Sequence, residues 1–206
     1  MSSDTTILYV ADPMCSWCWG FAPTLRALRE VAPEVPVEIV LGGLAADSDE
    51  PMEESMRGYV KQAWHDVSKC SGVNFNFDFW DLCQPRRSTY PACRAVLVAR
   101  QHNLASPMFD AIQQAYYLEA RNPSDLDVLA DVAQELGIPK PVFLESMQAP
   151  ETQAALQVDF QTRRDLGAQS FPSLAVRHQG RLQLLHRGWC SPSAVQEIWR
   201  LWDHNA

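Results

Sequence analysis

The feature that most constrains the fold of this chain is a pair of cysteines placed between a strand and a helix. Residues 5–12, TTILYVAD, form a short apolar run that is typical of a buried strand. Cys15 and Cys18 follow in DPMCSWCWGFAP, and apolar side chains then recur at helical spacing over residues 21–32. Residues 35–43, VPVEIVLGG, are rich in β-branched side chains and end at two glycines, so they predict a second strand. Strand, helix and strand in such quick succession indicate a parallel crossover unit, which is half of an α/β sheet.

Strand and helix patterns of the same kind return at the end of the chain. Residues 170–190, SFPSLAVRHQGRLQLLHRGWC, contain two strand-like runs separated by the turn-forming pair Gln179-Gly180. They predict a β-hairpin. Ser191 is the predicted N-cap of a final helix, with Pro192 at its first position, and the apolar side chains that follow share one face.

The middle of the chain is helical in pattern, so the predicted order is β, α, β, a helical insert, then β, β, α. Residues 72–83, GVNFNFDFWDLC, alternate apolar and polar side chains and are interpreted as a loop or short extended segment. The helical segments of the insert are residues 52–69, 90–102, 107–120, 124–136 and 151–166.

Two helix starts carry further local signals. Pro23 lies inside the first predicted helix and cannot supply the N–H that would bond the carbonyl of Trp19, so a kink is expected there. Ser88 or Thr89 precedes the helix predicted at residues 90–102. Either one is interpreted first as its N-cap and second as a contact for an anion or for glutathione.

Composition excludes several classes of function. The 206 residues are 47% hydrophobic, which allows a substantial core, and the formal net charge of −8 argues against a nucleic-acid partner. No apolar run reaches 18 residues, and the N-terminus shows neither a basic region nor a signal-length apolar run. We therefore expect a soluble, cytoplasmic protein that binds no membrane.

The chain has six cysteines, too few for a disulfide scaffold at this length. A reducing compartment would keep ordinary pairs open, so any disulfide here is expected to be transient and functional. Four cysteines outside the motif are interpreted as small side chains that are buried or half-buried: Cys70, Cys83, Cys93 and Cys190.

The position of Cys15 and Cys18 suits thiol-disulfide exchange. A cysteine in the turn before a helix faces unpaired backbone N–H groups and the positive end of the helix dipole, which favour the thiolate. Cys15 is therefore the predicted nucleophile. Cys18 lies one turn later on the same face and is expected to be less exposed, which suits a resolving thiol.

Other uses of a cysteine pair are poorly supported. A closed zinc site needs four ligands, and no second close pair of Cys or His follows, so no metal site is predicted. Covalent haem attachment needs His directly after the second cysteine, where this chain has Trp19.

These residues carry a resemblance to a known family. The Cys15-Ser16-Trp17-Cys18 motif, the helical insert and Phe171-Pro172 before the hairpin resemble the DsbA family of thioredoxin-fold proteins. DPMCSWCWGFAP and the segment STYPACRAV resemble its cytosolic FrnE-like branch, described as predicted protein disulfide isomerases. The resemblance implies an α/β thioredoxin fold with a large all-helical insertion. Residues 1–48 and 167–206 would form the thioredoxin-like domain and residues 49–166 the insertion.

The resemblance also implies roles for individual residues. Cys15 would attack and Cys18 would resolve, while Pro172 would be a cis-proline facing them and Phe171 would offer backbone hydrogen bonds to a thiol substrate. Trp17 is the further substrate contact that we expect, because it must point outward from a tight turn. The substrate would be a thiol or disulfide of a protein or a glutathione-like molecule. No bound cofactor is implied, although glutathione could serve as redox partner. The redox direction and the oligomeric state stay open.

A rival reading comes from a different enzyme class. Glutathione transferases of the kappa type and 2-hydroxychromene-2-carboxylate isomerases resemble this fold and insert, and they generally have Ser where Cys15 stands. A resolving thiol has no evident role in simple glutathione activation, so the two cysteines favour redox chemistry. A third alternative, a non-catalytic binding module, would tolerate the loss of Cys15.

Overall fold

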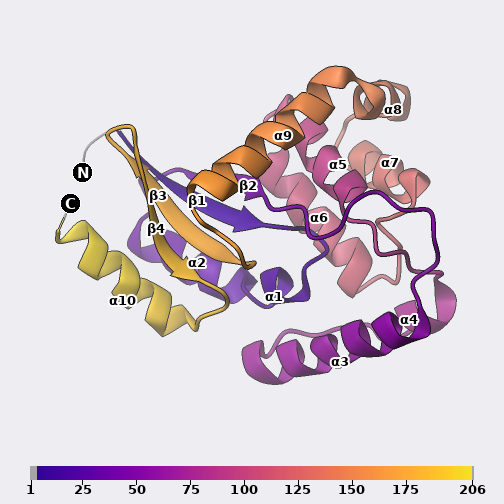
Figure 1. Cartoon of the computed structure of the whole chain (residues 1–206), viewed down its shortest axis with the longest axis horizontal. Coiled ribbons are helices and arrows are strands. Elements are labelled where there is room, and N and C mark those ends of the chain that lie inside the picture. The colour runs from indigo at the N-terminus through magenta and orange to yellow at the C-terminus, as the bar shows by residue number, and fades with distance from the viewer. Residues whose placement is uncertain (1–3, 206) are drawn as a thin grey trace.

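A four-stranded sheet organises the protein, whose computed structural model describes residues 4–205 (Figure 1). Its strands are β1 (Thr5–Ala11), β2 (Val37–Leu41), β3 (Ser173–His178) and β4 (Arg181–Arg187), in the order β2-β1-β3-β4. β1 pairs in parallel with β2 and antiparallel with β3, and β3 forms the predicted hairpin with β4. The sheet thus joins the two ends of the chain, as the predicted element order requires.

β1 is an inner strand with side chains buried on both faces of the sheet. Ile7 and Tyr9 join the main hydrophobic core on one face. Leu8 and Val10 join a smaller cluster with Leu166 on the other. Successive side chains of a strand point to opposite faces, so a strand covered on both sides reads as a continuous apolar run. This explains the uninterrupted ILYVA segment of the sequence.

The helix expected after the two cysteines is broken in two. α1 (Ser16–Trp19) ends before Gly20, and α2 (Ala22–Val31) starts afresh with Pro23 in its first turn. The expected kink is therefore a complete break. Proline is tolerated in the first turn of a helix because the N–H it lacks has no partner there.

The final helix lies on the same side of the sheet as α2. α10 (Pro192–Asp203) packs against α2 (Figure 1). Its predicted N-cap is confirmed, since the Ala194 N–H donates to Ser191 Oγ at 3.2 Å.

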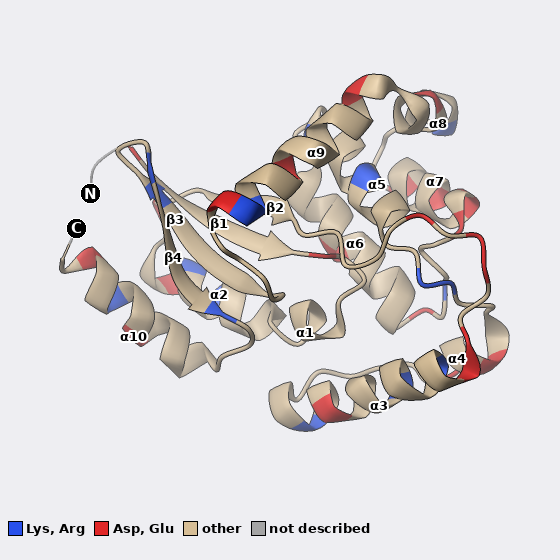
Figure 2. Ribbon diagram, in the orientation of Figure 1, with Lys and Arg blue, Asp and Glu red and all other residues tan. Residues whose placement is uncertain are grey.

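Helices fill the chain between β2 and β3. All five predicted helical segments are present, with ends shifted by a few residues, and α4 and α8 are additional. Among the described residues, no helix is both long enough and apolar enough to cross a membrane. Charged residues are spread over many elements (Figure 2). The helices of this region are α3 (Glu54–Ser71), α4 (Phe79–Leu82), α5 (Tyr90–Arg100), α6 (Ala105–Tyr117), α7 (Leu126–Glu135), α8 (Lys140–Gln148) and α9 (Pro150–Asp165).

An aromatic cluster explains why residues 72–83 misled the sequence analysis. The interpretation of this segment as a loop or short extended segment is wrong at its end, where α4 lies. Four residues are too short to show helical periodicity, and the regular aromatic spacing serves packing around Trp64 of α3, which is fully buried. Six ring centroids lie 4.9–5.8 Å from that of Trp64: those of Phe75, Phe77, Phe79, Trp80, Tyr116 and Tyr117.

The helical region is tied to the outer edge of β2 by a buried carboxylate. Asp159 of α9 accepts the Leu41 N–H at 2.9 Å and pairs with Arg100 of α5 at 2.8 Å. Arg100 also donates to the Ile39 carbonyl at 2.8 Å. Edge strands carry unpaired backbone groups, and these side chains satisfy part of that edge. The division of the chain at residues 49–166 stays a prediction.

We expect Asp159→Ala to lower the free energy of unfolding by about 2–3 kcal/mol, because the Leu41 N–H and Arg100 both lose a buried partner. The cost stays moderate because the Arg100 side chain is 39% exposed and so partly solvated. Urea denaturation measures the change. The matched control is Asp165→Ala on the same helix, where the carboxylate is exposed and the loss should stay within about 0.5 kcal/mol. Equal losses in the two variants would contradict the role of Asp159.

Candidate functional site

The site begins at the turn between β1 and α1. The Cys15 N–H donates to the Asp12 carbonyl at 3.0 Å, and Cys15 occupies the N-cap position of α1 in an extended conformation. The N–H groups of Cys18 and Trp19 both donate to the Cys15 carbonyl. Within the described residues, the N–H groups of Ser16 and Trp17 have no hydrogen-bond acceptor. Two free backbone donors therefore lie directly beside the first cysteine.

Cys15 and Cys18 are both free thiols with different surroundings. Both residues are buried, but Cys15 lines a groove and keeps 7% of its area exposed, whereas Cys18 keeps 1%, in the order that the sequence predicted. Burial raises the pKa of the Cys18 thiol well above its ordinary value of 9.0. A hydrogen bond with Cys15 and a negative charge on Cys15 both raise the pKa of Cys18 further. Cys18 is therefore protonated at neutral pH while Cys15 is unreacted.

The loop before β3 contacts the first cysteine. The Phe171-Pro172 peptide bond is cis, which confirms that prediction. The Cys15 thiol donates to the Phe171 carbonyl oxygen over 3.7 Å. Residues that are far apart in the chain thus form one surface, because β1 and β3 are hydrogen-bonded neighbours in the sheet.

A groove of about 230 Å³ opens over Cys15. It lies between the turn that carries Cys15, the first half of α3 and the loop before β3. Residues on its walls include Cys15, Trp17, Leu44, Tyr59, Arg87 and Phe171.

The two tryptophans of the segment DPMCSWCWGFAP, Trp17 and Trp19, lie in different surroundings. Trp17 is half-buried, lines the groove and has its ring 6.3 Å from that of Trp189, so it is placed where a substrate could touch it. Trp19 stacks on Tyr117 at 5.6 Å and donates its ring N–H to the Asn74 carbonyl. Trp19 therefore serves the packing between α1 and the helical region.

Asp12 is a site residue that the sequence analysis missed. Its carboxylate is fully buried and accepts the N–H groups of Met14 at 2.8 Å and Leu44 at 2.7 Å. It also accepts the Thr89 hydroxyl at 2.7 Å and the Cys93 thiol at 3.6 Å. Burial raises the pKa of this carboxyl group above its ordinary value of 3.8, although the hydrogen bonds oppose the shift. An ionisable residue at the end of an apolar strand was the available signal.

Thr89 has a different partner from the one predicted. It stands at the N-cap position of α5, but its hydroxyl makes no capping hydrogen bond. The hydroxyl instead donates to Asp12 and accepts the Ala45 N–H at 3.0 Å. An N-cap hydroxyl accepts a hydrogen bond from an N–H of its own helix, whereas the Thr89 oxygen accepts the N–H of Ala45 and gives its proton to Asp12.

Comparison with known proteins assigns the family. The family model described as the DSBA-like thioredoxin domain matches residues 6–190. The chain belongs to this family. The predicted thioredoxin fold with a helical insertion is thereby confirmed for this DSBA-like protein.

Solved structures of similar proteins cover nearly all of the chain. A crystal structure from Nitrosomonas europaea, described as a candidate protein disulfide isomerase, is 30% identical over 98% of this chain and 99% of its own, with a TM-score of 0.86. The cytosolic disulfide reductase DsbM from Pseudomonas aeruginosa is 28% identical over 98% of this chain and 100% of its own, with a TM-score of 0.80. A 2-hydroxychromene-2-carboxylate isomerase, 12% identical over 97% of this chain and 94% of its own with a TM-score of 0.60, shares the fold.

The curated relatives are longer proteins. The ClpXP adapter protein SpxH of Bacillus subtilis is 20% identical over 172 residues, which are 82% of this chain and 56% of the relative. The chain thus spans about half the length of the curated relatives it matches.

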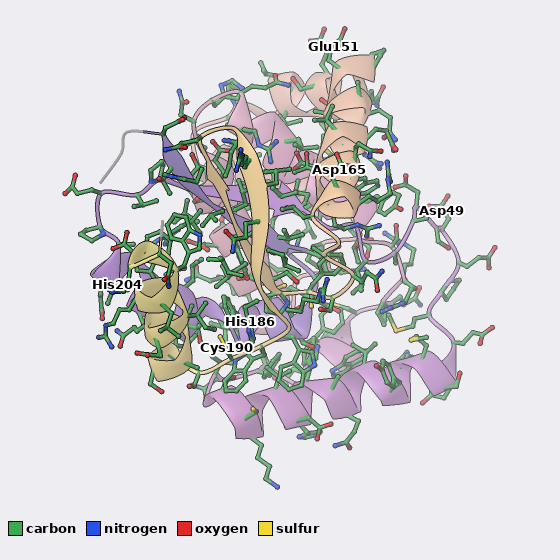
Figure 3. The ribbon with its side chains drawn as sticks, turned by 60° about the vertical axis from the view of Figure 1, so that its left-hand side comes forward. Asp49, Glu151, Asp165, His186, Cys190 and His204 are labelled. Atoms are coloured by element: carbon green, nitrogen blue, oxygen red, sulfur yellow. The ribbon has the colours of Figure 1, made fainter. Side chains whose placement is uncertain are left out.

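The remaining cysteines of this DSBA-like protein mostly match their interpretation as packing residues. Cys93 and Cys190 are buried and Cys83 is half-buried, and Figure 3 labels Cys190 in the connection between β4 and α10. Cys70 is exposed, which corrects the interpretation for that residue, because it lies on the solvent side of α3 near the helix end. The part of the chain that the structure describes holds no cluster of three or more metal-binding side chains.

Gly42 makes room for the aromatic ring of Phe171. A Cβ atom added at Gly42 would lie 2.2 Å from Cε1 of that ring, closer than any real contact. The guanidinium of Arg163, a residue of α9, lies 5.8 Å from the centroid of the Phe171 ring. The Phe171 ring is thus held between the end of β2 and a cation. Gly42 thus fixes the position of the loop that carries the Phe171 carbonyl beside Cys15.

We expect Gly42→Ala to lower the free energy of unfolding by about 1–3 kcal/mol and to slow reactions at Cys15, because the Phe171 ring must move. Thermal unfolding and the alkylation rate of Cys15 measure the two effects. The matched control is Gly58→Ala in α3, where an added Cβ meets nothing within 4 Å. That variant should gain about 0.5–1 kcal/mol from helix propensity and react normally. An unchanged Cys15 rate in Gly42→Ala would separate the Phe171 loop from the reactive site.

Asp12→Asn should change how stability depends on pH. Because the pKa of Asp12 is raised in the folded protein, the folded state binds more protons than the unfolded state at pH values just above 3.8. The wild-type free energy of unfolding therefore falls as pH rises through that window, and the Asn variant lacks this contribution. Urea denaturation at several pH values should show the wild-type advantage shrinking as pH rises. A growing advantage would mean that the four hydrogen bonds outweigh burial. Asp165→Asn, an exposed carboxylate, is the control.

Proposed function

We propose that this protein is a cytoplasmic thiol-disulfide oxidoreductase, of the disulfide isomerase-like kind, in which Cys15 attacks and Cys18 resolves. The observation that carries the proposal is the position of Cys15. It lies at the wall of an open groove beside the Phe171 carbonyl, and Cys18 interacts with it from a buried position. One thiol can thus be reached by a substrate while the other reaches only its neighbour.

Similar proteins support this reaction class and compartment. DsbM of Pseudomonas aeruginosa, 28% identical, is described as a cytosolic disulfide reductase, and a further structure of it contains GSH. A thiol or disulfide of a protein or a glutathione-like molecule is accordingly the proposed substrate. The protein itself needs no bound cofactor for this exchange, since the electrons come from its own sulfur atoms.

The proposed reaction moves two electrons in two exchanges. The Cys15 thiolate attacks one sulfur of a substrate disulfide, the substrate S–S bond breaks, and the first substrate thiolate leaves. Cys18 then loses its proton and attacks the Cys15 sulfur, which releases the second substrate thiolate. The protein ends with a Cys15–Cys18 disulfide and the substrate with two thiols. The reverse sequence oxidises a pair of substrate thiols.

The electrostatics of the pair order these steps. The negative charge of Cys15 and its hydrogen bond both help to raise the pKa of Cys18. When Cys15 forms a mixed disulfide, that charge disappears and the thiol of Cys18 becomes easier to ionise. The resolving thiol is therefore activated by the first exchange.

The loop before β3 offers backbone partners for a substrate. Within the described chain, the N–H groups of Gln169, Ser170 and Phe171 donate no hydrogen bond to the protein. Gln169 and Ser170 are exposed, and all three residues line the groove. We propose that an extended substrate segment pairs with this loop while Trp17 contacts its apolar part.

The glutathione-transferase or isomerase alternative has weaker support. The similarity to 2-hydroxychromene-2-carboxylate isomerase, at 12% identity, concerns the fold alone. Cys18 has no role in activating glutathione for conjugation. In thiol-disulfide exchange it has one, because it ionises and attacks after Cys15 has formed the mixed disulfide. A conjugation assay with an electrophile and glutathione separates the classes.

We expect Cys18→Ser to accumulate mixed disulfides on Cys15 with a disulfide substrate such as oxidised glutathione, because nothing is left to resolve them. Intact-mass spectrometry after acid quenching measures the adduct. Cys15→Ser should form no adduct and no internal disulfide.

The matched control is Cys70→Ser, which removes an exposed thiol outside the groove and should leave the wild-type reaction unchanged. If Cys15→Ser keeps the wild-type exchange activity, another group carries the reaction, and if the wild type itself exchanges nothing, the protein is a binding module. If Cys18→Ser traps nothing while the wild type conjugates glutathione to electrophiles, the transferase alternative is correct.

A further inference from the structure

Arg87 brings a positive charge into the groove beside Cys15. It is half-buried, and among the described residues that line the groove it alone is charged. Its neighbours on the groove wall include the apolar side chains of Leu44 and Val60 and the ring of Tyr59. A cation that has lost part of its water shell in such surroundings gains by meeting an anion.

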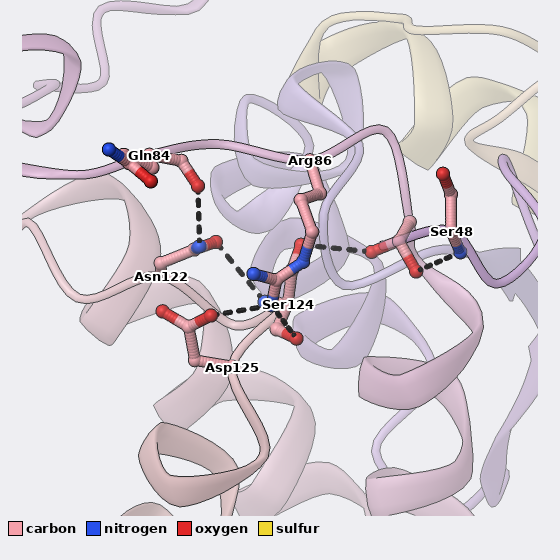
Figure 4. Close-up of polar contacts among 7 residues, drawn as sticks. Ser48, Gln84, Arg86, Asn122, Ser124 and Asp125 are labelled. Atoms are coloured by element: carbon pink, nitrogen blue, oxygen red, sulfur yellow. Dashed lines mark hydrogen bonds and ion pairs between the residues drawn. The ribbon is translucent and has the colours of Figure 1, made fainter. Parts of the chain in front are cut away.

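The preceding residue shows what a structural arginine looks like here. Arg86 donates to the Asp125 carboxylate and to the Ser124 carbonyl, each at 2.5 Å (Figure 4). The same loop is held by further contacts, such as the donation of the Asn122 amide to the Gln84 carbonyl at 3.2 Å. The backbone that carries Arg87 is thus fixed without any contribution from the Arg87 side chain.

Arg87 itself has no hydrogen bond or ion pair with any residue from 4 to 205. Tyr116 is close enough to feel its charge, but burial raises the pKa of that phenol far above its ordinary value. A phenol that keeps its proton supplies no counter-charge. The positive charge of Arg87 is therefore available to a ligand in the groove.

We propose that Arg87 is a specificity-determining residue that binds a carboxylate of a small thiol or disulfide substrate beside Cys15. A planar guanidinium matches a carboxylate through two parallel hydrogen bonds, which gives orientation as well as affinity. The groove, about 230 Å³, is smaller than the roughly 300–1,000 Å³ of sites for drug-sized ligands, so it suits a peptide-sized fragment. In a protein of net charge −8, one such cation selects an acidic ligand against a repulsive background.

This inference rests on the proposed function and names the substrate class of the same site. Its test uses the fully reduced protein in a single turnover, in which one protein dithiol and one disulfide yield a protein disulfide and two small thiols. The two probes are oxidised glutathione, which carries carboxylates, and bis(2-hydroxyethyl) disulfide, which is uncharged. The measured quantity is the ratio of their second-order rate constants, read by quenching and mass spectrometry.

We expect Arg87→Gln to lower this ratio about fivefold to tenfold, the effect of losing one partly solvated, bidentate ion pair. Arg87→Lys should lower it less, since it keeps the charge and loses the fork. The matched control is Arg181→Gln on β4, which removes the same charge from an exposed position outside the groove and should leave the ratio unchanged.

Two results would overturn the inference: an unchanged ratio in both Arg87 variants, or an equal fall in Arg181→Gln. Arg87→Lys keeps the charge and a side chain of similar length, so it decides the matter even if Arg87→Gln misfolds. Failure of the proposed function looks different, because neither disulfide would then oxidise the reduced wild-type protein. If Arg87→Gln slowed the reaction with acidic protein disulfides and left the reaction with oxidised glutathione unchanged, the assignment to a small substrate would be wrong.

Discussion

The buried carboxylate of Asp12 is the interaction on which the arrangement of the site depends. Its donors come from three places: the turn that leads to Cys15, the loop after β2 at Leu44, and the start of α5 at Thr89 and Cys93. A carboxylate in this position without donors would be strongly destabilising. The three segments must therefore reach it together, and in doing so they place the two thiols, one wall of the groove and the helical region against one another.

A second carboxylate plays a similar part at the edge of the sheet formed by β2. Asp159 joins α9 and α5 to the edge of β2, and β2 leads directly into Gly42, over which the Phe171 ring packs. The contact between Phe171 and Cys15 thus depends on the helical region as well as on the sheet. The helices between β2 and β3 are part of the scaffold of the site. The groove accordingly takes its walls from α3 as well as from the turn and loops at the ends of the strands.

The sequence predicted what is encoded locally and missed what depends on distant partners. The strands, the hairpin turn at Gln179-Gly180 and the Ser191 cap follow from neighbouring residues, and all are confirmed. The position of Asp12 at the end of an apolar strand was a signal that the residue is unusual, but its contact with Thr89, 77 positions away, has no local signal in a single sequence. The helix α4 was missed because its aromatic residues pack around Trp64, so their spacing reflects a tertiary cluster.

The break at Pro23 also changes the physical account of Cys15. The sequence analysis invoked the dipole of a long helix, but α1 has only four residues and ends before Gly20. A macrodipole grows from aligned peptide units, so most of that contribution is absent. What remains is local: the free N–H groups of Ser16 and Trp17, the two residues that follow Cys15. The turn that carries these two donors is held in place by Asp12 through the Met14 N–H, so the surroundings of Cys15 depend on a buried carboxylate and not on a long helix.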